Sequence, residues 1–108
     1  MPFAKAVVLT RDSLLWIQGM ELQVEDLERG LLVSDWQMTS PRERHRVTLR
    51  IQRETSKRGE AGLVSVHAEE QVFGESGWTE IPSSGLWEYQ TLKAIESRYQ
   101  SLFEAKAP

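Results

Sequence analysis

Two long runs of the sequence alternate between polar and apolar residues, and this pattern restricts the fold more than any other feature. Every second residue of 44–53 is apolar over most of the run, and the same holds for much of 63–73. Successive side chains of a strand point to opposite faces, so each run predicts a strand with one buried and one polar face. Two such strands are typical of an antiparallel sheet with one face in water. The apolar positions are Val47, Leu49, Ile51, Val64, Val66, Ala68 and Val72.

The charged residues form blocks that favour pairing of these two strands. Residues 41–58 contain seven basic side chains, and the flanking blocks 21–35 and 59–80 contain five carboxylates each. An antiparallel hairpin would place Arg46 beside Glu69, and such cross-strand pairs contribute roughly 0.2–1 kcal/mol each. The alternative is a nucleic-acid or phosphate site. Because the adjacent acids would cancel the field of the basic block, we expect no nucleic-acid partner.

The remaining patterns predict two helices and two further strands. Residues 3–18 have apolar side chains at helical spacing, and residues 86–105 form a long apolar stripe without glycine or proline. We therefore predict an α+β fold, with a four-stranded antiparallel sheet packed against an N-terminal helix and a long C-terminal helix. The other expected segments are strands over 20–27 and 31–37, a turn at 28–30, and loops over 55–62 and 74–85.

Length and composition describe one ordinary globular domain. The chain has 108 residues, which is enough for a single domain, 1–108, with a buried core. It contains no cysteine, which excludes disulfides, thiolate metal sites and a cysteine nucleophile. No apolar run approaches the roughly 20 residues that a membrane-spanning helix needs. Residues 1–10 lack the basic start and apolar stretch of a secretion signal, so the compartment stays open.

Side chains suited to catalysis are few. The only histidines are His45 and His67, and their spacing does not indicate a metal site. His67 and Glu69 would share one face of a strand and could form an acid–base pair. The alternative is that both are polar residues on the solvated face of the sheet. We expect no catalytic, metal or cofactor-binding residues, and therefore no enzyme activity and no cofactor.

Aromatic residues near the last helix form the candidate interaction surface. Trp78 and Trp87 lie on either side of the segment that leads into this helix, and Tyr89 follows just beyond. Exposed tryptophan and tyrosine are typical anchors of protein interfaces. The alternative is that both tryptophans close the end of the sheet as core residues. Trp36 is expected to lie in the core.

Several short segments together resemble a known family. They are GLLVSDW at residues 30–36, RERHRVTL at 42–49, Gly77-Trp78, and the start of the last helix with Glu88 and Leu92. In this order, after an opening helix, they resemble a single domain of the NlpB/DapX (BamC-like) outer-membrane lipoprotein family. The resemblance extends over nearly the whole chain, but this chain has no lipobox cysteine and corresponds to one domain only.

The resemblance has implications for fold, place and partner. It implies a helix-grip domain, in which an antiparallel sheet holds a helix. It also implies a lipid anchor on the native precursor, a position on the periplasmic side of the outer membrane, and another envelope protein as the partner. Because residues 1–10 contain no targeting signal, a cytoplasmic location is the alternative.

Three functional hypotheses follow. The first is a non-catalytic protein-interaction or scaffolding domain of an envelope lipoprotein, linked to outer-membrane protein assembly. The second is a binding module for a small apolar ligand beneath the helix that the sheet holds. The third is an enzyme that uses His67 and Glu69. The first is preferred, mainly because of the family resemblance, and the oligomeric state stays open.

Overall fold

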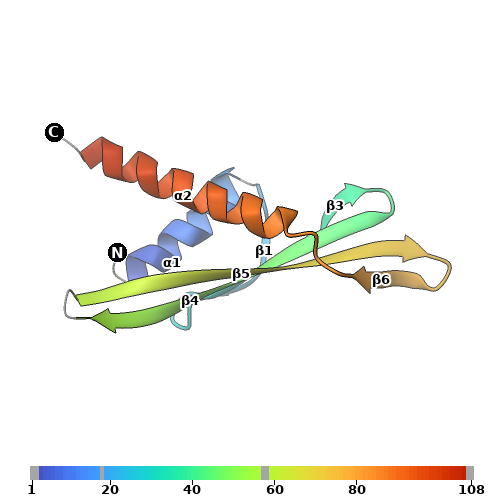
Figure 1. Cartoon of the computed structure of the whole chain (residues 1–108), viewed down its shortest axis with the longest axis horizontal. Helices are drawn as coiled ribbons and strands as arrows, with labels where there is room; N and C mark the ends of the chain where they lie inside the picture. The colour runs from blue at the N-terminus through green and yellow to red at the C-terminus, as the bar shows by residue number, and fades with distance from the viewer. Residues whose placement is uncertain (1–2, 18, 57–58, 107–108) are drawn as a thin grey trace.

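The two alternating runs form the longest strands of the protein. A computed structural model of the chain describes residues 3–17, 19–56 and 59–106 (Figure 1). Strands β4 (Glu43–Ser56) and β5 (Gly59–Gly74) pair in antiparallel register along their whole shared length. The predicted pair is confirmed, since Arg46 lies directly opposite Glu69.

Four shorter strands complete an antiparallel sheet in the order β1-β2-β4-β5-β6, with β3 also paired to β4. On one side β4 pairs with β2 and β3, and on the other side with β5. A turn of two residues, Glu75 and Ser76, joins β5 to β6, where Gly77 has a positive φ of 98°. The four strands are β1 (Leu22–Asp26), β2 (Leu31–Ser34), β3 (Gln37–Ser40) and β6 (Gly77–Ile81).

Two helical segments cover one face of this sheet (Figure 1). Helix α1 (Phe3–Asp12) continues into one π-helical turn, η1 (Ser13–Ile17), and α2 spans Leu86–Lys106. Both predicted helices are therefore present. Helix α1 lies close against β5 because Gly62 has no side chain: a Cβ there would lie 2.6 Å from the Cβ of Ala6.

The core lies between the helices and the sheet. Its centre is formed by the apolar face of β4, which the alternation pattern predicts correctly, and by the inner side of α1. The hydroxyl of Ser34 accepts a hydrogen bond from the N–H of Val47 at 2.9 Å, so this buried polar group has a partner. The buried apolar residues of this cluster are Phe3, Ala6, Val7, Leu14, Met20, Leu32, Val47, Leu49, Ile51, Ala68 and Ile95.

The predicted fold class, a helix-grip-like arrangement of four strands and two helices, is wrong, because the sheet that the described residues form has six strands. The strand expected over 31–37 ends at Ser34, and β3 is a separate strand that pairs with the start of β4. The expected loop over 74–85 contains β6. The two missed strands, β3 and β6, are short, so the alternation of polar and apolar residues within them gives little signal. Their hydrogen bonds come from partner strands, which the local sequence does not reveal.

The expected polar loop over 55–62 is also wrong for the residues that the structure describes, and its residues 57–58 lie outside them. Strand β4 continues to Ser56 and β5 begins at Gly59, so the hairpin extends well beyond the apolar alternation. Register is continuous to the pair Ser56–Gly59, so backbone pairing with the partner strand holds this polar stretch in strand conformation.

Candidate functional site

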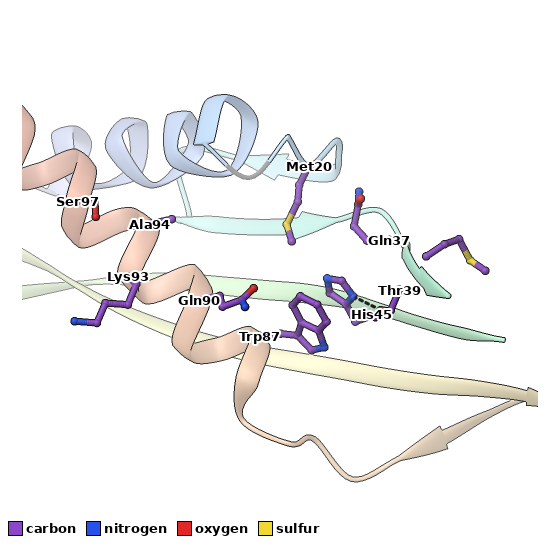
Figure 2. A pocket seen from close by; sticks show the side chains of 10 residues that line it. Met20, Gln37, Thr39, His45, Trp87, Gln90, Lys93, Ala94 and Ser97 are labelled. Atoms are coloured by element: carbon purple, nitrogen blue, oxygen red, sulfur yellow. Dashed lines mark hydrogen bonds between the residues drawn. The ribbon is translucent and has the colours of Figure 1, made fainter. Parts of the chain in front are cut away.

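A cleft of about 670 Å³ opens between α2, β3 and the beginning of β4. Figure 2 shows how the side chains converge: Trp87 and Gln90 come from α2, Thr39 from β3, His45 from β4, and Met20 from the segment before β1. Its volume is within the range of small-molecule sites, although it is open to solvent along one side.

His45 is the central polar group of this cleft. It lies two residues before Val47, so it points to the helix-covered face, and only 5% of its surface is exposed. Its ring stacks on the indole of Trp87 with a centroid distance of 3.6 Å and an angle of 4°. Nδ1 lies 3.0 Å from the hydroxyl of Thr39, as the dashed line in Figure 2 shows. Nε2 is buried without a hydrogen-bond partner among the described residues.

Burial determines the charge of this imidazole. Removal from water lowers the pKa of His45. The carboxylate of Glu70, which lies opposite His45 on β5, raises the pKa and offsets only part of this lowering. The net pKa lies below the usual value of 6.5, so the ring is neutral at pH 7. A neutral ring can remain stacked beneath Trp87 without the cost of a buried charge.

Glu70 and Glu88 fasten the start of α2 to the sheet. The sequence pattern places Glu70 on the apolar face; it is half-buried there and accepts a hydrogen bond from the N–H of Ser84 at 2.6 Å. Glu88 accepts bonds from the hydroxyl of Ser83 and from the N–H of Ala68, at 2.8 and 3.0 Å. Burial alone would raise the pKa of Glu88, but these hydrogen bonds lower it below its usual value.

The opposite face of the sheet carries a ladder of arginine and tryptophan side chains, which we call the Arg–Trp ladder: Trp36, Arg44, Arg46 and Trp78. The guanidinium of Arg44 lies between two indoles, 4.3 Å from the centroid of Trp36 and 4.1 Å from that of Trp78. Arg46 lies 4.6 Å from the Trp36 ring. Neither of the two helices covers this helix-free face.

Hydrogen bonds hold both arginines in place. Arg44 donates from Nε to the side-chain oxygen of Gln71 at 2.8 Å. Arg46 donates from Nε and from one terminal nitrogen to the two carboxylate oxygens of Glu69, at 3.1 and 3.0 Å. This bidentate pair occupies the carboxylate that sequence reasoning combined with His67 as an acid–base pair. His67 itself is exposed and lies opposite Thr48.

The structure separates the residues of the predicted interaction surface. Trp78 contacts Arg44, whereas Trp87 stacks on His45. Arg44 and His45 are consecutive residues of β4, so they point to opposite faces of the sheet. Tyr89 is 61% exposed near the start of α2, beside the amine of Lys93 at 5.7 Å. Trp78, Trp87 and Tyr89 therefore do not form one patch.

The sequence-based expectations did not include the places of Trp36, His45 and Trp87 in these sites. The expectation that Trp36 belongs to the core is wrong, because it is half-buried on the helix-free face against Arg44 and Arg46. The position of His45 could have been inferred, since the alternation of 44–53 places it on the same face as Val47, Leu49 and Ile51. Nothing in the sequence indicated that Trp87 would cover it.

The side chains described here do not form an evident metal site. Among residues 3–17, 19–56 and 59–106, no group of three or more histidine, aspartate or glutamate side chains is arranged to hold a metal ion. In the same part of the chain, neither helix has the length and apolar character needed to cross a membrane.

Comparisons with known proteins do not assign a family. No protein-family model matches the sequence, and no curated protein matches it at a significant level. The resemblance to the NlpB/DapX lipoproteins therefore depends on the short sequence segments alone.

Proposed function

We propose that this chain is a non-catalytic protein-interaction domain that binds its partner through the Arg–Trp ladder. The observation that carries the proposal is the arrangement of Arg44 between Trp36 and Trp78 on a face without a covering helix. Tryptophan and arginine are the residues most enriched among interface hot spots. Because Gln71 also holds Arg44, these side chains lose little further conformational freedom when a partner binds.

The exposed apolar surface next to the ladder supports the same role. Phe73, the cross-strand partner of Trp78, packs edge-on against it with a centroid distance of 5.3 Å, yet remains 49% exposed. An exposed apolar side chain beside stacked tryptophan and arginine gives a face that combines aromatic, apolar and arginine side chains. That composition is typical of a protein interface.

The Arg–Trp ladder could instead serve stability alone. A cation–π contact at an exposed site is worth about 0.5–1 kcal/mol, so the ladder would help to hold the end of an uncovered sheet. The two roles differ in their consequences: a purely structural ladder affects unfolding and leaves binding unchanged.

The place and partner follow from the family resemblance. We propose a position on the periplasmic side of the outer membrane, with another envelope protein as partner in outer-membrane protein assembly; a cytoplasmic location is the alternative. The support is the pair of segments 30–36 and 42–49. A lipid anchor on the native precursor belongs to this proposal, and mass spectrometry of the native protein would detect it.

A pull-down from envelope extract with the full chain tests the interaction. Trp78→Ala and Arg44→Ala should each remove a partner that wild type recovers, while melting temperatures stay near that of wild type. Tyr89→Ala is the matched control, because it removes an exposed aromatic residue from the helix side of the molecule. Equal recovery by all variants, or a loss with Tyr89→Ala only, would contradict the proposal.

A second candidate function is the binding of a small ligand in the cleft beside Trp87. The buried Nε2 of His45, which has no partner among the described residues, is the observation in its favour. A panel of small aromatic compounds, screened by ligand-observed NMR, would test it. Compounds that bind wild type and not His45→Phe would support a ligand site there, and equal binding to both proteins would exclude His45 from it.

A further inference from the structure

One edge of β5 is paired along only part of its length. Strand β6 pairs with residues 70–74, and the carboxylate of Glu88 takes the N–H of Ala68. Between Gly62 and Val66, no strand among the described residues lies on this side of β5. This stretch is called the free edge below.

The direction of the backbone groups at the free edge follows from two hydrogen bonds. The N–H of Ala68 points outward to Glu88, whereas the N–H of Phe73 points inward to the carbonyl of Arg42 on the β4 side. The β4–β5 register is continuous, so even-numbered residues of β5 present their N–H and C=O outward. Val64 and Val66 therefore offer donors and acceptors at a repeat of about 6.8 Å, two strand residues.

An apolar groove lies directly beside the free edge. It encloses about 500 Å³ between α1, α2 and β5, and its lining includes Leu9, Val64, Leu92, Ile95 and Tyr99. Helix α2 runs antiparallel to the edge, because its residue 88 meets Ala68 and its residues 92–99 lie near 62–64. In Figure 1, α2 diverges from β5 toward the tip of the hairpin, and α1 lies between them.

The large apolar side chains that line this groove are only partly covered. Leu92 is 43% exposed and Tyr99 is 44% exposed, although both lie along its wall. Glu96 is the one charged residue that lines it among those described, and its carboxylate lies 3.8 Å from the amine of Lys93. An occupant must therefore be apolar where it faces the groove and must not bring an acidic group to Glu96.

We propose that an extended peptide segment of a partner protein adds as a strand to the free edge and places alternate apolar side chains in the groove. This inference rests on the proposed role in protein interaction but uses a different surface from the Arg–Trp ladder. Only an extended main chain offers donors and acceptors at the spacing that the edge presents, and its period of two directs every second side chain toward the helices. If a second copy of this chain paired through the same edge, its own α2 would also be brought to the junction. A single extended strand without a helix beside it therefore fits this edge better than a second copy does.

The first variant removes the edge hydrogen bond without breaking the sheet. Proline at residue 66 deletes an N–H that points away from β4, so Val66→Pro should keep the β4–β5 ladder intact. Its matched control is Val66→Thr, which preserves the N–H and the branched shape. Leu92→Lys places a charge in the groove, and Tyr89→Lys is its control on the exposed side of the same helix. Amide NMR spectra verify that each variant is folded.

The probes are a phage-displayed library of random short peptides and a synthetic peptide that alternates valine and threonine with a lysine at each end. Selection should enrich alternating apolar residues, and binding should protect the amides of Val64 and Val66 from hydrogen exchange. Val66→Pro and Leu92→Lys should each weaken binding by about tenfold or more, and the two controls should bind like wild type.

Other results would overturn the inference. One is the absence of any binding peptide, and another is peptide binding that Val66→Pro and Leu92→Lys leave unchanged. If such peptides instead lose binding with Trp78→Ala, the interaction role of the Arg–Trp ladder would stand while the strand-addition site would fall. Protection of the same amides by concentration-dependent self-association, without peptide, would make a second copy the occupant and would also overturn the proposal.

Discussion

Consecutive residues of β4 take part in two polar pairs with opposite surroundings. Arg46 lies with Glu69 on the helix-free face, where a bidentate ion pair keeps contact with water. His45 lies opposite Glu70 on the helix-covered face, where Trp87 stacks over the ring. The pairs are neighbours in the same ladder, yet one is charged and solvated and the other contains a neutral, buried imidazole.

The difference shows that the presence or absence of helices over a face, and not the pairing of β4 with β5, decides how much a polar pair contributes to stability. Water screens the pair of Arg46 and Glu69, so its net contribution to the free energy of unfolding is small. In the second pair burial lowers the pKa of His45, and the Glu70 carboxylate does not compensate fully. This conclusion can be tested by comparing the stability of variants with a substitution on one face with that of matched variants on the other face.

The largest effect is expected from a charge in the centre of the helix-covered face. Leu49 has no exposed surface, so Leu49→Asp should unfold the domain, with a loss of several kcal/mol, about the whole stability of a small domain. Thr48→Asp, on the helix-free face of the same strand, should stay folded. Circular dichroism and thermal denaturation measure both. A folded Leu49→Asp protein would break the assignment of the faces.

A smaller loss is expected where α1 lies against β5. A Cβ at Gly62 would meet the Cβ of Ala6 at 2.6 Å and Cγ2 of Ile51 at 3.2 Å, so Gly62→Ala should cost about 1–3 kcal/mol. Gly74→Ala, at the other end of β5, has nothing within 4 Å and should be neutral. Urea denaturation compares the two variants, and equal midpoints would show that α1 does not lie so close.

The pH dependence of stability should come from the helix-covered face. The folded pKa of His45 is lowered, so below the usual value of 6.5 the unfolded chain binds a proton that the folded chain does not. The free energy of unfolding should therefore be constant above this pH and should fall as the pH falls below it. His45→Phe, which keeps an aromatic ring beneath Trp87, should reduce this slope in urea titrations between pH 7 and pH 5. A slope that is unchanged in His45→Phe would contradict this assignment.

The smallest effect is expected from the solvated pair. Arg46→Ala and Glu69→Ala should each cost under about 1 kcal/mol, because a partly exposed ion pair that water screens gains little over its separately solvated partners. A double-mutant cycle in urea measures the coupling between the two side chains. A loss of several kcal/mol from Arg46→Ala alone would mean that the helix-free face is not solvated there.

Part of the fold could be predicted from local patterns. The alternation of 44–53 and 63–73 identified β4 and β5, assigned Val47 and Leu49 to the core, and placed Arg46 opposite Glu69. The apolar spacing of 86–105 identified α2. These features depend on periodicity and pairing within neighbouring segments, which the order of residues expresses directly.

The candidate sites could be predicted only in part, because they join segments that are distant along the chain. Trp78 and Trp87 were recognised as aromatic anchors, but the sequence does not show that they lie on opposite faces. The same holds for Trp36, whose large apolar side chain suggested the core although Arg44 and Arg46 hold it on the helix-free face.

The order of residues is enough to assign which side chains of the central hairpin face the core, because the strand period of two is a local property of the backbone. The positions of the short strands β3 and β6 depend on the folded chain, since their hydrogen bonds come from β4 and β5. The folded chain is also needed for α2 to bring Trp87 over His45 and Glu88 to the edge of β5. Stacking, desolvation and backbone capping act only over contact distances, and only the folded chain brings these groups within such distances.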